Sequence, residues 1–100
     1  MNAAVWELTR GEFALEVLAG RRDFPLLGNS GTAARLARSV HWAEKTGQNS
    51  DIAREAFDKA ILQHHCAEVL IAYADGMTVP KHFLREYADY FSPEQQLGGS

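Results

Sequence analysis

Apolar residues recur every three or four positions in four separate stretches of the chain, which is the spacing of helices that bury one face. This pattern predicts helices over residues 9–19, 33–46, 50–75 and 79–91. No stretch shows the period-two alternation of a half-buried strand. We therefore predict an all-α fold, a single-domain bundle of four helices around a long central third helix. The domain covers residues 1–91, and we expect residues 92–100 to form a flexible polar tail.

Several helix boundaries are marked by residues with known capping roles. Thr9 and Glu12 have the spacing of a capping box, in which each side chain accepts a hydrogen bond from the other residue's backbone N–H. Thr32 precedes the second helix and is its expected cap. Gly20 and Gly47 stand where the first two helices should end, because glycine adopts the left-handed conformation that ends helices.

Residues 21–31 form the longest irregular stretch. Pro25 biases the residue before it away from helical conformation. We expect Phe24, Leu26 and Leu27 to fold back onto the core as an apolar anchor. The glycines, asparagine and serine of residues 28–31 are typical of a turn.

The third helix carries apolar residues on two faces. The first face is expected to build the core and contains Ile52, Ala53, Ala56, Phe57, Ala60, His64, Ala67, Leu70, Ile71 and Ala74. The second face has the spacing of a helix-packing seam and contains Leu62, Cys66, Val69 and Tyr73. Two interpretations of this seam stay open. Other helices of the same chain cover it, or it binds a second copy or a partner.

Trp42 points about 180° away from the apolar stripe of the second helix. Arg35, Arg38 and Lys45 lie near it on the same side of that helix. Tryptophan and arginine are enriched among interface hot spots, so this group is a candidate partner-binding patch. The alternative is that Trp42 packs under the 21–31 segment.

Asp51, Glu55 and Asp58 share the outer face of the third helix's first half. Three carboxylates on one stripe are candidates for meeting a basic surface of a partner. The alternative is a solvated face, in which Arg54 and Lys59 supply local pairing.

His64, His65 and Cys66 are adjacent, but adjacent side chains on a helix diverge by about 100°. Chelating pairs on a helix stand four residues apart, so we predict no metal site and no cofactor. The same divergence leaves Cys66 without a well-placed base, and we predict that the protein is not an enzyme. We expect His64 to be buried and His65 to lie on the surface.

The net charge of −3 argues against direct binding of nucleic acid or of anionic membrane. A helix-turn-helix formed by residues 33–57 would present Asp51, Glu55 and Asp58 to phosphates, which is the wrong sign. No run of residues is long and apolar enough to span a membrane. Cys66 is the sole cysteine, which fits a reducing cytoplasm.

In size, charge and helical make-up the whole chain resembles inhibitors from phages and other mobile elements, in particular the anti-CRISPR proteins. The resemblance implies a non-enzymatic protein that binds a large nucleoprotein effector and blocks its access to DNA by occupying a protein surface. Immunity proteins and antitoxins are similar on the same grounds. We therefore expect a protein-binding inhibitor with a larger partner. The alternatives are a self-associating helical adaptor, which would form a homodimer, and a DNA-binding regulator.

Overall fold

The computed structural model describes residues 3–27 and 31–90, and within them it confirms the all-α fold. The elements in chain order are the 3₁₀ helix η1 (Val5–Glu7), α1 (Arg10–Leu18), α2 (Ala33–Thr46), α3 (Ser50–Ala74), α4 (Lys81–Glu86) and the 3₁₀ helix η2 (Ala88–Tyr90). The predicted tail over 92–100 and the centre of the predicted turn, residues 28–30, lie outside the described residues.

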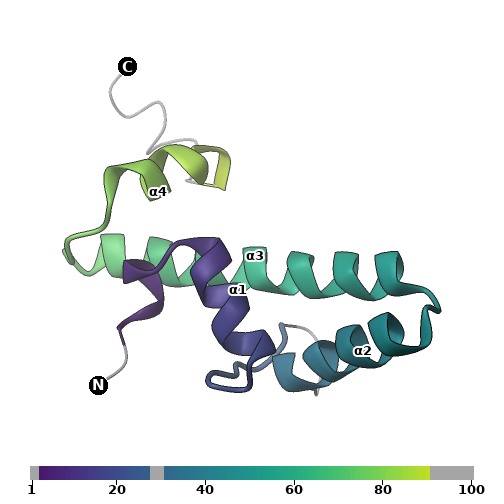
Figure 1. The fold of residues 1–100 in the computed structure, drawn as a ribbon. Helices are drawn as coiled ribbons and strands as arrows, with labels where there is room; N and C mark the ends of the chain where they lie inside the picture. The colour runs from purple at the N-terminus through teal and green to yellow at the C-terminus, as the bar shows by residue number, and fades with distance from the viewer. Residues whose placement is uncertain (1–2, 28–30, 91–100) are drawn as a thin grey trace.

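α3 is the axis of the molecule, which measures 52 × 31 × 25 Å. As Figure 1 shows, α2 runs antiparallel to the first half of α3, α1 crosses α3 near its middle, and α4 lies beside the second half. The prediction of a central third helix is therefore confirmed. The fourth helix is shorter than the predicted 79–91, because Pro80 is its cap and a 3₁₀ turn replaces the α-helix after Tyr87.

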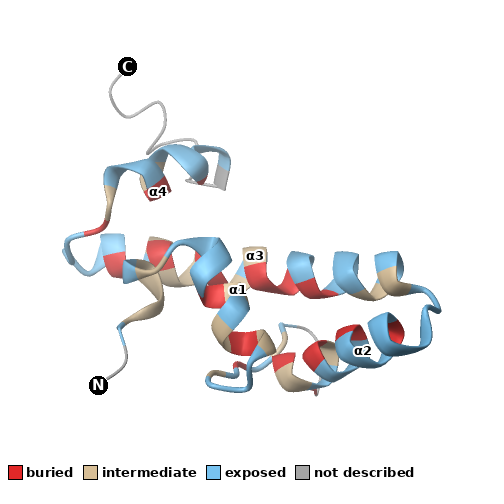
Figure 2. Ribbon diagram, in the orientation of Figure 1, coloured by how far each residue is buried: buried red, intermediate tan, exposed pale blue. Residues whose placement is uncertain are grey.

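The buried side chains form two clusters along α3 rather than one core. The first joins α1, α2 and the first half of α3 through Phe13, Val17, Phe24, Ala33, Ala37, Val40, Phe57, Ala60 and Ile61. The second joins the remainder of α3 to the C-terminal elements through Cys66, Val69, Ala72, Val79, Phe83 and Tyr87. Figure 2 shows the buried positions on α3 and on the helices beside it.

The second cluster decides between the two interpretations of the helix seam. Cys66 and Val69 are buried beneath α4, and Leu62 is partly buried against the same cluster. Tyr73 alone of the four is exposed, with 49% of its surface accessible. The chain's own C-terminal elements therefore cover most of the seam.

The expected core face of α3 is wrong at both ends, where Ile52 and Ile71 are exposed. Buried residues instead follow a stripe through Phe57, Ile61, His65 and Val69, four residues apart. Each step of four residues turns the stripe by about 40° around the helix. The stripe thereby rotates from the side of α2 to the side of α4.

This rotation also makes the histidine prediction wrong, because His65 is completely buried and His64 is only partly so. His65 Nε2 lies 2.8 Å from the Leu8 carbonyl oxygen, and Nδ1 lies 2.7 Å from the Tyr87 hydroxyl. A carbonyl only accepts, so Nε2 carries the proton and the Tyr87 hydroxyl donates to Nδ1. The ring also contacts Phe13 of the first cluster and Phe83 of the second. One neutral imidazole thus connects both clusters.

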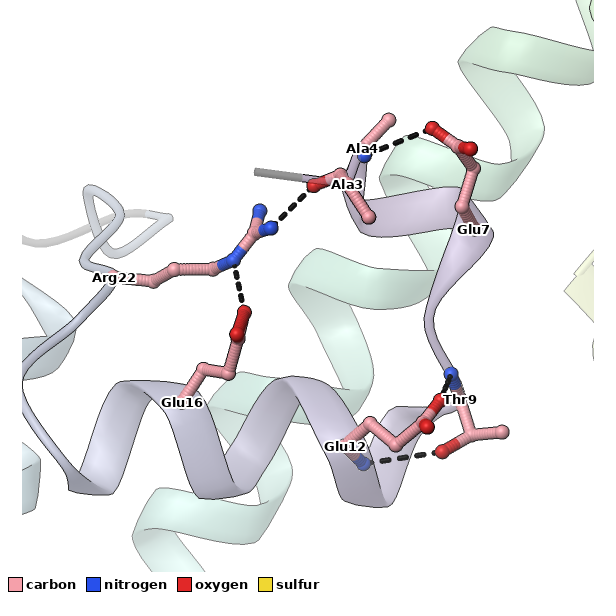
Figure 3. Close-up of polar contacts among 7 residues, drawn as sticks. All are labelled: Ala3, Ala4, Glu7, Thr9, Glu12, Glu16 and Arg22. Atoms are coloured by element: carbon pink, nitrogen blue, oxygen red, sulfur yellow. Dashed lines mark hydrogen bonds and ion pairs between the residues drawn. The ribbon is translucent and has the colours of Figure 1, made fainter. Parts of the chain in front are cut away.

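The N-terminal segment is attached to α1 by polar contacts that Figure 3 draws. The Thr9–Glu12 capping box is confirmed, with distances of 2.8 and 3.1 Å. Arg22 donates to the Glu16 carboxylate and to the Ala3 carbonyl. The chain before α1 is thereby held beside the chain after it.

Thr32 is the N-cap residue of α2, as predicted, but its side chain makes no capping hydrogen bond. Asp23 takes that role from the preceding loop, and its Oδ1 accepts from the Ala34 and Phe24 N–H groups, each at 2.8 Å. Burial raises the pKa of the Asp23 carboxyl, but the two backbone hydrogen bonds, a hydrogen bond from the Thr32 side chain and the positive charge of Arg38 all lower it. The pKa of Asp23 therefore lies below its ordinary value. Gly20 and Gly47 end their helices at φ 78° and 73°, as predicted.

Of the expected loop anchor, Phe24 is buried and Leu26 is partly buried against the first cluster. Leu27 is exposed, so the prediction for this residue is wrong. An antiparallel bridge pairs Pro25 with Thr32, and Leu26 N–H donates to the Gly31 carbonyl at 3.1 Å. The bridge turns the chain at Leu27 away from the core.

We predict that the free energy of unfolding falls as the pH drops below about 6.5, the ordinary histidine pKa. Burial lowers the pKa of His65, so the unfolded chain binds a proton at a pH where the folded chain does not. Urea titrations between about pH 7 and pH 5 should show this loss. His65→Gln should reduce the pH dependence, whereas His82→Gln, at an exposed position, should not. An unchanged pH dependence in His65→Gln would contradict the assignment.

We also predict that Asp23→Ala lowers the free energy of unfolding by about 1 kcal/mol, because two backbone N–H groups lose their acceptor. Asp23→Asn keeps a side-chain oxygen at the same place and should lose much less. Thermal unfolding followed by circular dichroism measures both. Equal losses in the two variants would show that the negative charge, rather than the capping oxygen, is what stabilises the start of α2.

Candidate functional site

Trp42 lies on the outer face of α2 with 60% of its surface exposed, so it does not pack under the 21–31 segment. It lines a groove of about 530 Å³ between α2 and the start of α3. The groove is lined by Arg35, Arg38, Ser39, Trp42, Ala43, Gln48, Asn49, Ile52 and Ala53. We call this the Trp42 groove. Three of the predicted site residues, Arg35, Arg38 and Trp42, thus come together.

The sequence of α2 explains why these three side chains face outward. Its buried residues are Ala33, Ala37, Val40 and Ala43, which occupy one side of the helix. Positions 35, 38 and 42 lie on the other side and are three and four residues apart, so they form one row along the surface. Small alanines let α2 approach α3 closely, which brings the first turn of α3 near Trp42.

Ile52 forms the other apolar wall of the groove and is 67% exposed. Gly47 and Asn49 both adopt positive φ angles, 73° and 54°, and reverse the chain within a few residues. The first turn of α3 therefore starts directly beside the end of α2. The apolar pattern of the third helix predicted Ile52 in the core, whereas it lies at the edge of the fold, directly after this turn.

The two arginines of the groove are positioned by the loop before α2. A Cβ atom on Gly31 would lie 2.9 Å from Arg35 Nη1, so the glycine leaves room for the arginine side chain to lie over the loop. Arg38 is close enough to Asp23 to lower the pKa of that carboxyl. Among the described residues, neither arginine forms an ion pair. The positive charge of Arg35 is therefore available to an external anion, and that of Arg38 is compensated only in part, by Asp23.

The remaining predicted partner-binding residues do not join this groove. Lys45 is exposed in the last turn of α2, outside the lining. The acidic stripe Asp51, Glu55 and Asp58 is exposed on a different side of α3 and lines a groove of about 920 Å³ between α1 and α3. The two candidate partner-binding groups therefore lie on two separate surfaces.

Part of the acidic stripe is paired within the chain, as the alternative interpretation held. Arg54 lies 3.7 Å from the Asp58 carboxylate and 3.9 Å from that of Glu44. These side chains are all about half exposed, where ion pairs contribute little to stability. Leu15, 64% exposed, is the most exposed of the large apolar side chains that line the groove between α1 and α3.

His64 and Cys66 of α3 are surrounded by other side chains of the fold. His64 stacks on Phe24 with ring centroids 4.2 Å apart, and its Nε2 lies 3.6 Å from Glu68. Cys66 is buried, and burial together with the Glu86 carboxylate raises the pKa of its thiol. A raised pKa keeps the thiol protonated and weakens it as a nucleophile. Within the described chain no three His, Cys, Asp or Glu residues are placed to hold a metal ion.

The protein is therefore an all-α helical bundle whose Trp42 groove is lined by one aromatic and two basic side chains. Comparison with protein-family models, with curated proteins and with solved structures finds no match to this chain. None of the described helices has the length and apolar content needed to cross a membrane. Function must therefore be argued from the groove.

We predict that Trp42→Ala and Ile52→Ala each change the free energy of unfolding by no more than about 0.5 kcal/mol, because both side chains are mostly solvated. Phe83→Ala, at a position 2% exposed, should cost about 3–5 kcal/mol. Chemical denaturation of the three variants measures these values. A large loss in Trp42→Ala would mean that Trp42 supports the fold and not a binding surface.

Proposed function

We propose that this protein is a non-enzymatic, protein-binding inhibitor that attaches to a larger partner through the Trp42 groove and blocks it by occlusion. The observation that carries the proposal is the pairing of Trp42 and Ile52, 60% and 67% exposed, beside two arginines that have no ion pair among the described residues. Exposed apolar side chains with a polar rim are typical of protein interaction sites.

The residue types of the groove support a protein partner. Tryptophan and arginine dominate interface hot spots, where a buried anchor is surrounded by groups that exclude water. Trp42 provides a large rigid anchor, and Arg35 and Arg38 can fix its orientation by pairing with carboxylates. The resemblance to anti-CRISPR proteins suggests that the partner belongs to a nucleoprotein effector, which the inhibitor would keep from its DNA.

The alternative functions have less support. Cys66 and Val69 of the seam are covered by α4 and cannot contact a second copy. Tyr73 is the exposed residue of the seam. A DNA-binding role for the first turns of α3 places the exposed carboxylates of Asp51 and Glu55 against phosphates. Both observations favour a hetero-partner at the Trp42 groove.

We predict that Trp42→Ala weakens binding to the partner by more than about 2 kcal/mol, a loss of roughly 30-fold or more in affinity. The partner is captured by immobilised wild-type protein and then titrated by calorimetry with each variant. Leu15→Ala is the matched control, since Leu15 is equally exposed but lines the α1–α3 groove.

Wild-type affinity in Trp42→Ala, with a loss in Leu15→Ala, would reassign the binding surface to the α1–α3 groove. For the inhibitor role, the captured partner is assayed for its own activity with increasing amounts of this protein. Loss of activity that saturates at equal molar amounts supports stoichiometric occlusion. Full activity of a saturated partner contradicts inhibition.

A further inference from the structure

We propose, on the basis of the proposed function, that the Trp42 groove receives an acidic amphipathic helix of the partner. One apolar side chain of that helix lies between Trp42 and Ile52, and its carboxylates pair with Arg35 and Arg38. Three features of the groove carry the proposal: its charge, its shape and the prior positioning of its cations.

The charge of the groove is opposite to that of the protein. The chain as a whole carries −3, yet the two charged side chains that line the groove are both arginines. Neither is neutralised by an ion pair within the described chain. Guanidinium groups bind carboxylates through two parallel hydrogen bonds. Such a pair selects a negatively charged partner and also fixes its orientation.

The shape of the groove fits a helix. Arg35, Arg38 and Trp42 lie within eight residues of α2, or about 10 Å along its axis. Two to three turns of a partner helix cover that length and can lie in the furrow between α2 and the start of α3, as helices pack on helix pairs. An extended peptide gains affinity by adding to a sheet edge, and the described residues form no sheet.

The loop before α2 lies beside Arg35 and places a carboxylate near Arg38. Gly31 leaves space for the Arg35 side chain, and the Asp23 carboxylate, fixed by its bonds to Phe24 and Ala34, attracts Arg38. Side chains that are ordered in advance lose less entropy on binding. The same loop that caps α2 thus positions both groups that recognise the partner.

Single-stranded nucleic acid is the competing anion, and the groove suits it less well. Binding of single strands uses several aromatic side chains on which successive bases stack, whereas this groove has one. Asp51, next to Ile52 and exposed, would repel a phosphate chain that continued beyond the groove.

The test uses the Trp6→Phe variant, in which Trp42 is the sole tryptophan and its fluorescence reports on the groove. The probes are a synthetic helical peptide of about four turns with a leucine stripe flanked by glutamates, the same peptide with lysines in place of the glutamates, and an oligothymidine. We expect the acidic peptide to shift Trp42 emission to shorter wavelength and to bind at least about tenfold more tightly than the basic peptide. Equal binding of both peptides, tighter binding of the oligonucleotide, or no binding of the acidic peptide overturns the proposal.

Variants of the full chain separate this proposal from the proposed function. Arg35→Ala and Arg38→Ala should each lower the affinity for the acidic peptide and for the captured partner about tenfold. The difference in affinity from wild type should shrink as salt is added. Arg85→Ala, an exposed arginine of α4, is the matched control and should have no effect. If Trp42→Ala abolishes partner binding while both groove arginine variants bind normally, the acidic helix is wrong and the proposed function stands. If the captured partner is insensitive to Trp42→Ala, the proposed function itself fails.

Discussion

The arrangement of this protein depends on one neutral imidazole. His65 lies where the two buried clusters meet, and both of its ring nitrogens are satisfied, one by the Leu8 carbonyl and the other by the Tyr87 hydroxyl. These bonds join the segment before α1 and the segment after α4 to the middle of α3. Burial and the Glu86 carboxylate raise the pKa of Tyr87 to about 12, so its hydroxyl keeps the proton that it donates. The ion pair between Arg10 of α1 and Glu86 of α4, at 2.9 Å, adds a connection between these two helices at the surface.

The helices could be predicted from the sequence because their signals are local. The capping box at Thr9 and the glycines at 20 and 47 act within a few residues, and the structure places all three helix boundaries there. The predictions that were wrong depended on distant residues. The Thr32 side chain makes no capping hydrogen bond from its N-cap position, because the Asp23 carboxylate accepts from the Ala34 N–H instead. His65 is buried in place of His64, because the buried stripe of α3 rotates toward α4.

The candidate site, like the helices, could be predicted where its residues lie on a single helix. Arg35, Arg38 and Trp42 share a row on one helix, so helical geometry alone grouped them correctly. Ile52 could not be added, because its place beside Trp42 depends on two left-handed residues that set the direction of α3. Asp51, Glu55 and Asp58 were predicted as a separate stripe on the third helix, and they line a different groove from Trp42. Local periodicity orders residues on one helix, whereas the relation between two helices is fixed by the turn between them.

The alanines of α2 have a consequence for how this protein can diversify. Ala33, Ala37 and Ala43 make the contact with the rest of the bundle using very little side-chain volume. The opposite row of the helix therefore contributes almost nothing to the interior. Its three large residues, Arg35, Arg38 and Trp42, can therefore be exchanged for others without repacking the interior, so this surface can change while the scaffold stays the same.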